Sequence, residues 1–274
     1  MLALLGAAAW GVGDFLGGLG ARRVHVLTVL FVSQAAGLAG VLVWAAVSRD
    51  PLPGAVDALP AAAAGAAGLV GLGALYRGFA VGAMGIVAPI SALSPLVPLA
   101  VDVARGSPPT SLQWAGICLA LVGVVAVSRE PSHSTGTRLA AGAGLAVVAA
   151  LGFGVFIVGI DAAAEASVPW AVVFARAASV SLALAAALAT RTALTSPRHL
   201  LPLLLAVGVF DTGANVLVAA ATTHGSAGIV AVLSALYPVA TIALARLVLR
   251  ERLSAVRRTG AAIALCGAAL VAAG

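Results

Sequence analysis

Three charged side chains, Asp14, Arg176 and Asp211, lie near the middle of long apolar runs. A charge near the centre of a bilayer costs at least about 2.5–3.5 kcal/mol on insertion scales, so such a residue usually faces a cavity or an opposite charge. Glycines surround Asp14 and let another helix or a solute approach its carboxylate. Because burial favours the protonated form of an acid, Asp14 and Asp211 are candidates for proton coupling. The alternatives for Asp14 are a structural partnership with Arg176 and a hydrogen bond that packs two helices together.

Arg176 stays protonated inside a protein, so it requires an anion. The sequence offers Asp211, Asp14 or the carboxylate of a bound solute. If Asp211 is the partner, the two residues form a structural ion pair. If Arg176 faces a cavity, it can recognise an amino acid or another organic acid. The sequence leaves both alternatives open.

Polar residues recur at helical spacing beside these charges. Asp211 and Asn215 are four residues apart, with Thr222 further along, which places them on one face of a helix. Such a face fits the wall of a polar cavity, although interhelical hydrogen bonds, worth roughly 0.6 kcal/mol each on average, explain it too. The candidates for substrate binding, besides Arg176, are Asn215, Gln34, Trp10, Ser91, Ser94, Ser234, Tyr237 and Thr241.

The composition requires that lipid surrounds most of the chain. Of the 274 residues, 62% are apolar and only 9% are charged, whereas soluble domains carry about 25% charged residues. The formal net charge is +6, and the basic residues are all arginine. Since these arginines lie between apolar runs, they indicate loops beside anionic headgroups and not nucleic-acid binding.

The apolar runs predict transmembrane helices, because each run approaches the length of about 20 residues that spans a bilayer. They are too continuously apolar for barrel strands, which alternate over about ten residues. We predict ten spans, at residues 1–20, 26–47, 57–80, 85–103, 110–128, 138–160, 168–190, 198–220, 226–249 and 254–273.

The chain contains an internal repeat. Residues 85–95 match residues 228–238, and residues 9–15 match residues 150–156, in the same order along the chain. Because each repeat holds an odd number of helices, the second enters the membrane from the opposite side, which is a recurring plan of secondary transporters. We therefore predict an all-α membrane protein of ten transmembrane helices in two inverted five-helix repeats, at residues 1–128 and 138–274, joined by a loop at 129–137.

Prolines and glycines also recur in both repeats. Prolines that interrupt the helices at 85–103 and 226–249 predict breaks near a binding site; they are Pro89, Pro95, Pro98 and Pro238. Glycines seven residues apart predict close helix packing at 110–128 and 254–273; they are Gly116, Gly123, Gly260 and Gly267. This packing occurs either within one chain or across a homodimer through these two helices.

The arginines also predict the topology. Most of them lie in the connections after the odd-numbered spans, whereas the even connections hold Arg49 and Arg105. The positive-inside rule then places both termini outside the cytoplasm. Richness in Ala, Gly and Arg without Lys suits a bacterial genome, so we predict a multi-pass protein of the bacterial plasma (inner) membrane.

The ordered set of these features resembles the EamA-domain transporters of the drug/metabolite transporter superfamily over essentially the whole chain. The resemblance is carried by Trp10-Gly11, Phe174-Ala-Arg176, Leu236-Tyr-Pro238, an acidic turn at 250–253 and Gly260. The first repeat departs from the pattern, since residues 104–107 lack the acidic turn and residues 31–34 lack an arginine matching Arg176. The resemblance implies transport of small metabolites driven by an ion gradient. It adds weight to Asp14, because related small multidrug transporters carry a membrane carboxylate in their first helix.

These observations predict a proton-coupled secondary transporter that exports small polar metabolites such as amino acids by alternating access. The alternative is an exporter of cationic amphiphilic compounds, in which Asp14 binds drug and proton in competition; a passive facilitator or a membrane scaffold is a further alternative. The sequence contains no GxSxG, HExxH or Walker A motif and no metal-ligand spacing, so we expect no enzyme, catalytic residue, metal or cofactor.

Overall fold

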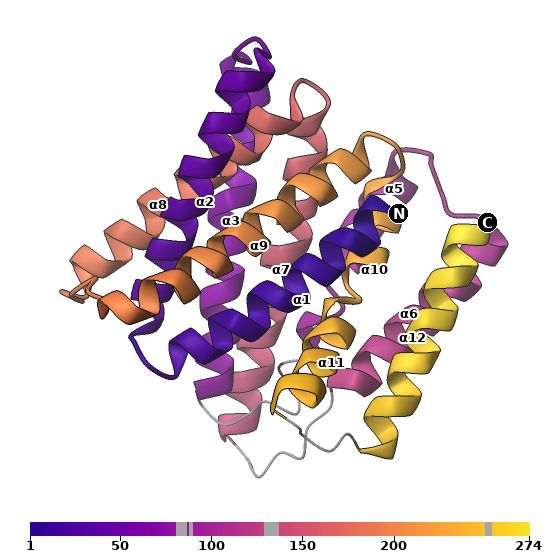
Figure 1. The fold of residues 1–274 in the computed structure, drawn as a ribbon. Helices are drawn as coiled ribbons and strands as arrows, with labels where there is room; N and C mark the ends of the chain where they lie inside the picture. The colour runs from indigo at the N-terminus through magenta and orange to yellow at the C-terminus, as the bar shows by residue number, and fades with distance from the viewer. Residues whose placement is uncertain (81–86, 88–89, 129–136, 250–253) are drawn as a thin grey trace.

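The computed structural model describes residues 1–80, 87, 90–128, 137–249 and 254–274, and the regular elements within them are all helical (Figure 1). Up to residue 128 the helices are α1 (Leu2–Ala21), α2 (Val26–Ser48), α3 (Ala55–Ala80), α5 (Leu96–Ala104) and α6 (Ser111–Ser128). After it come α7 (Thr137–Ala164), α8 (Val168–Ala189), the 3₁₀ turn η1 (Arg198–Leu200), α9 (Leu201–Thr222), α10 (Ala227–Ser234), α11 (Tyr237–Leu249) and α12 (Ala255–Ala273). Pro89, most of the predicted loop at 129–137 and the acidic turn at 250–253 lie outside the described residues.

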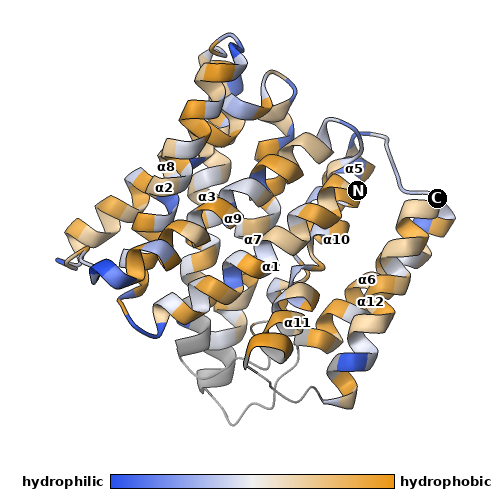
Figure 2. Ribbon diagram, in the orientation of Figure 1, coloured by the Kyte–Doolittle hydropathy of each residue, from blue (hydrophilic) through white to orange (hydrophobic). Residues whose placement is uncertain are grey.

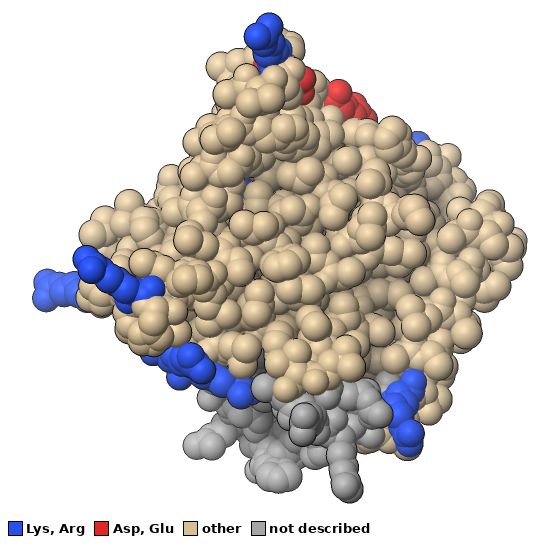
Figure 3. All heavy atoms as spheres, in the orientation of Figure 1, with Lys and Arg blue, Asp and Glu red and all other residues tan. Residues whose placement is uncertain are grey.

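The helices have the length and polarity of a multi-pass membrane protein. Six of them are long and apolar enough to cross a bilayer: Leu2–Ala21, Val26–Ser48, Ala55–Leu75, Gly142–Ala164, Val168–Ala189 and Arg198–Thr222. Shorter apolar helices lie at Ser111–Val127, Ala227–Thr241 and Arg258–Ala273. Hydrophobic residues line the helices and hydrophilic ones gather near their ends (Figure 2), so charged atoms on the visible face lie at its borders (Figure 3).

The two parts of the chain are interleaved and not set side by side. α1, from the beginning of the chain, packs along α9, and α3 packs along α7 in the same way. Likewise α2 contacts both α8 and α9, while α3 contacts α8. Every long helix before residue 128 is therefore covered mainly by helices that come after that residue.

Two of the predicted spans are broken at corresponding places. α10 ends at Ser234 and α11 begins at Tyr237, so that Pro238 falls in the first turn of α11. In the first repeat, turns at residues 92–95 precede α5, whose N-cap is Pro95. Proline lacks the backbone N–H that a helix interior needs but fits the first turn, where that N–H has no partner. The proline positions thus account for where the helices stop and restart.

The two ends of the bundle differ in charge. At one end the connection after α1 meets the connection after α8, where Thr28 hydrogen-bonds to the backbone O of Ala193 at 3.5 Å. We call this the arginine-rich end, because it holds Arg22, Arg23, Arg191 and Arg198. At the other, Ser167 donates to Asp50 at 2.8 Å and Arg105 pairs with Asp161 at 3.3 Å. We call this the acidic end, defined by Asp50, Asp161 and Glu165.

The glycines of α6 and α12 pack against each other within one chain. A Cβ added at Gly267 would lie 2.3 Å from the backbone N of Ala120, and one added at Gly123 would lie 2.3 Å from the backbone N of Ala264. These distances are shorter than any Cβ contact allows, so the two helices approach as closely as their backbones permit. The small-residue faces are thus covered inside the protomer, and a homodimer through these helices stays a prediction that would use their outer faces.

Substituting Gly267 with alanine should lower the stability of the protein. The added methyl group collides with backbone atoms of α6, and overpacking of this kind costs about 1–3 kcal/mol. Gly40→Ala is the matched control, because no atom lies within 4 Å of a Cβ added there and alanine raises helix propensity by up to about 1 kcal/mol. Thermal unfolding in detergent should show a lower midpoint for Gly267→Ala than for the wild type, and no decrease for Gly40→Ala. Equal midpoints for the two variants would contradict this packing.

Candidate functional site

A cavity of about 170 Å³ lies where the broken helices meet the long ones. It is lined by residues from α1, α2, α3, α7, α8, α9 and α10, from the turn at 92–95 and from the break that leads into α11. Its polar lining comes mainly from Asp14, Gln34, Arg176, Asp211 and Asn215. Helices from both parts of the chain are needed to form its wall, because the two parts are interleaved.

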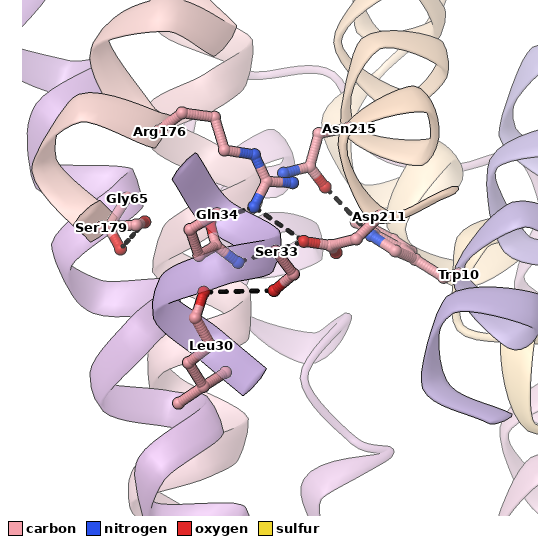
Figure 4. Close-up of polar contacts among 9 residues, drawn as sticks. All are labelled: Trp10, Leu30, Ser33, Gln34, Gly65, Arg176, Ser179, Asp211 and Asn215. Carbon is pink, nitrogen blue, oxygen red and sulfur yellow. Dashed lines mark hydrogen bonds and ion pairs between the residues drawn. The ribbon is translucent and has the colours of Figure 1, made fainter. Parts of the chain in front are cut away.

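Arg176 of α8, Gln34 of α2 and Asp211 of α9 form one closed network (Figure 4). Arg176 Nη1 lies 2.7 Å from Asp211 Oδ2 and also donates to Gln34 Oε1. Gln34 Nε2 donates to the same Asp211 oxygen at 3.2 Å. The arginine is 3% exposed and the glutamine 5%, so three helices meet around a desolvated charge.

The network uses only one edge of the guanidinium. Arg176 Nε and Nη2 are buried and have no hydrogen-bond partner among the described residues. These two N–H groups lie on the same side of the planar guanidinium, in the fork geometry that binds a carboxylate through both oxygens. Arg176 therefore pairs with Asp211, as one sequence alternative has it, and keeps an unused edge beside the cavity, so that recognition of a solute carboxylate stays a prediction.

Asp14 differs from Asp211 in having no cation. Its side chain is exposed to the cavity, and no arginine in the described part of the chain forms an ion pair with it. The neighbouring Trp10, one helical turn earlier, donates from Nε1 to Asn215 Oδ1 at 3.0 Å. This bond fixes α1 against α9 and leaves the Asp14 carboxylate free to meet a proton or a cationic group.

The structure brings most of the sequence-predicted residues to this cavity. Those that line it are Trp10, Asp14, Gln34, Ser94, Arg176, Asp211, Asn215, Ser234 and Tyr237. Ser91 is buried outside the lining, and Thr241 instead hydrogen-bonds to the backbone O atoms of Gly11 and Tyr237. Thr222 is not part of the lining either, and its hydroxyl donates to the backbone O of Ala219 in its own helix. The polar face of α9 therefore lines the cavity only as far as Asn215.

Several lining residues were missed by the sequence analysis. Phe153 and Phe156 of α7, with leucines of α3, form an apolar wall facing the polar groups. An aromatic residue in an apolar helix carries no sequence signal that separates lining from packing. Asp102 gave no sequence signal of burial either: it lies in the last turn of α5, yet it is 5% exposed and its carboxylate accepts a hydrogen bond from the backbone N–H of Gly228 in α10.

The arrangement can hold a small solute with both a charged and an apolar part. Two carboxylates and one guanidinium face the same cavity, and the apolar wall lies beside them. Within the described residues, no group of three His, Cys, Asp or Glu side chains is placed to hold a metal ion. The chemistry available is binding and proton exchange at side chains.

Fold and site together define a helical membrane protein with a partly polar cavity among its helices. The sequence model of the EamA-like transporter family matches residues 1–129 and again residues 140–273. The chain therefore belongs to the EamA-like transporter family, as its resemblance suggested, and this is a family of transporters of the drug/metabolite type and not of enzymes.

The other comparisons concern the fold alone. Comparison with curated proteins gives no match. Among solved structures, one described as "Crystal structure of protein" superposes with a TM-score of 0.80 at 17% sequence identity. The superposition covers 98% of this chain and 94% of that chain, so the helical arrangement is shared over nearly the whole length.

Removing Asp211 alone should destabilise the protein more than removing the whole pair. Asp211→Asn leaves the buried charge of Arg176 without an anion, and breaking a buried pair in this way costs about 3–5 kcal/mol. The double variant Arg176→Gln/Asp211→Asn should recover part of that loss. The control is Arg105→Gln at the exposed pair with Asp161, which should change stability by no more than about 1 kcal/mol. Thermal unfolding of these three variants and of Arg176→Gln gives the coupling energy between Arg176 and Asp211. If the losses of stability in the two single variants simply add up in the double variant, the buried ion pair is contradicted.

Proposed function

We propose that this protein is a secondary transporter that exports small polar metabolites, such as amino acids, and that the export is coupled to protons. The observation that carries the proposal is that one cavity holds both a group that can bind a cation and a group that can bind an anion. Among the described residues, Asp14 offers a carboxylate without a cation, and Arg176 keeps two N–H groups without an acceptor. An amino acid carries an ammonium group for the first and a carboxylate for the second.

Proton coupling is assigned to Asp14 and not to Asp211. Asp211 is already engaged as the anion of the buried Arg176 guanidinium, and taking that anion away would leave the guanidinium without an opposite charge. Asp14 has no such partner among the described residues and lines the cavity, so its proton can be exchanged against a solute. The proposal follows from this difference in partners.

A second candidate is the export of cationic amphiphilic compounds. It is favoured by the charges in the cavity, since two carboxylates against one guanidinium leave one negative charge when Asp14 is ionised. The volume favours the first candidate, because about 170 Å³ is less than the roughly 300–1,000 Å³ of pockets for drug-sized ligands. We therefore retain small metabolites as the main substrate class.

Alternating access and the inverted arrangement of ten spans belong to the same proposal. Helix pairs that exchange the two repeats, α1 with α9 and α3 with α7, are what a pseudo-two-fold axis in the membrane plane requires. The breaks at 92–95 and 235–236 also correspond between the repeats. With the arginine-rich end in the bacterial cytoplasm, both termini lie outside it and export runs towards the acidic end.

Asp14→Asn should abolish proton-coupled transport while the protein still folds. Asparagine has nearly the same shape as aspartate but binds no exchangeable proton at this oxygen. The measurement is the collapse of an imposed pH gradient in sealed vesicles on addition of amino acids, organic acids or lipophilic cations. Asp57→Asn, in the first turn of α3 and outside the cavity, is the control and should retain the activity. A gradient that the Asp14→Asn protein dissipates as fast as the wild type would rule out this role.

Arg176→Gln should separate the two substrate classes. Without the guanidinium, solutes that carry a carboxylate lose their bidentate partner, and their apparent affinity should fall by at least about tenfold, since a charged hydrogen bond contributes about 1.5–3 kcal/mol. Transport of lipophilic cations should persist, because Asp14 is unchanged. Uptake of labelled amino acids and labelled cations into the same vesicles gives both values. Unchanged transport of every acidic and zwitterionic solute would exclude recognition by Arg176.

A further inference from the structure

The acidic end of the molecule is closed where α5 packs against the beginning of α10. Asp102, in the last turn of α5, is 5% exposed, and its Oδ2 accepts a hydrogen bond of 2.7 Å from the backbone N–H of Gly228. No arginine of the described chain forms an ion pair with Asp102. A buried carboxylate is therefore held mainly by the N-terminus of a neighbouring helix.

The position of Asp102 within α5 does not explain a carboxylate. The C-terminal turn of a helix carries partial negative charge from unpaired C=O groups, which disfavours an acid there. The first turn of α10 has the opposite polarity, because its N–H groups lack partners inside the helix. The aspartate at position 102 is thus stabilised by its contact with α10. Separating α5 from α10 would remove that stabilisation.

Gly228 makes the close contact possible. A Cβ added there would lie 2.6 Å from Asp102 Oδ2 and 2.9 Å from the Cα of Leu99. A backbone Cα cannot move aside as a flexible side chain can. Any larger residue at position 228 must therefore push α5 and α10 apart.

This contact lies between the cavity and the acidic end. α10 runs from Gly228 to Ala231 and Ser234, which line the cavity, whereas neither the described α5 nor residues 227–230 line it. The lining extends instead towards the arginine-rich end, where it includes Gly17, Leu30, Leu72 and Val207. On the acidic side the space is filled by a buried apolar cluster that includes Ala3, Ala7, Leu99, Ala227 and Val230.

We propose that the Asp102–Gly228 contact is a latch that seals the cavity at the acidic end, and that it parts when the cavity becomes accessible from that end. The inference rests on the proposed transport, because a solute that crosses the protein must pass both ends of the cavity in turn. The repeat aligns Gly85 with Gly228, and the same offset aligns Asp102 with Ala245, which has no carboxylate. Asp102 therefore has no acidic counterpart at the aligned position of the second repeat, and its contact with Gly228 biases the protein towards the conformation closed at the acidic end.

The test is the accessibility of a cysteine inside the cavity. Cys118 and Cys266 are first replaced by alanine, and Ser234→Cys is introduced as the reporter below the latch. Glu165→Cys, in a separate protein, marks the side of the vesicle to which the acidic end faces. The rate of reaction with a membrane-impermeant thiol reagent, added from that side without any solute, measures how often the seal is open.

Asp102→Ala should raise this labelling rate by about tenfold, which corresponds to about 1.4 kcal/mol in the equilibrium between closed and open forms. Asp102→Asn keeps an acceptor oxygen without the charge and should give a smaller increase. Gly228→Ala wedges the same helices apart with the carboxylate intact, and should also raise the rate. Asp161→Asn, which removes the surface pair with Arg105 at the same end, is the matched control and should label like the wild type.

The labelling rates of the Asp102 and Gly228 variants show whether their contact holds the cavity closed. Wild-type rates in all Asp102 and Gly228 variants that reach the membrane would overturn the latch and leave the transport proposal intact, because labelling requires no substrate. Faster labelling in these variants, but not in Asp161→Asn, would support it. If the pH-gradient experiment then showed no transported solute, the seal would stand and the proposed function would fail. If Asp102→Ala does not fold, Asp102→Asn and Gly228→Ala carry the test.

Discussion

The buried positive charge of Arg176 is the constraint on which the centre of this protein depends. A guanidinium that keeps its proton and lies 3% exposed must have an anion and hydrogen-bond acceptors within reach. Asp211 supplies the charge and Gln34 the acceptor, so α2, α8 and α9 have to meet at one level of the bundle. The cavity lies at that level because the same three side chains, with Asp14 across from them, exclude close apolar packing there.

The broken helices complete what this constraint begins. Continuous helices at 87–104 and 227–249 would carry apolar side chains past the polar centre. Instead the backbone turns near a proline in both segments, and Ser94 and Ser234 reach the cavity wall at these turns. The short segments α5 and α10 that result can pack end against side, which is how Asp102 reaches the N-terminus of α10. One set of prolines thus shapes both the binding region and the closed end.

Much of the fold was predictable from the sequence, because lipid requires long apolar runs and prolines mark where they break. The helix ends agree with the predicted spans within a few residues, and most of the predicted polar residues line one cavity. The choice of partner for Arg176 was not predictable, since a sequence shows which face of a helix is polar but not which helix crosses it. The burial of Asp102 was not predictable for a related reason, because the sequence does not show that a helix more than a hundred residues later covers the last turn of α5. Phe153 and Phe156 gave no signal, because an apolar helix looks the same whether it faces lipid or a cavity.

The interleaving of the two parts of the chain has a consequence for biosynthesis. α1 and α3 leave the ribosome long before α9 and α7, the helices that cover them, have been made. Until then the glycines of α1 and the carboxylate of Asp14 face lipid or the insertion machinery, and the nascent first repeat has no closed core of its own. Helices of this kind are inserted one after another but become a folded domain only near the end of translation. Correct folding can therefore be checked by the cell only on the nearly finished chain and not on its first half.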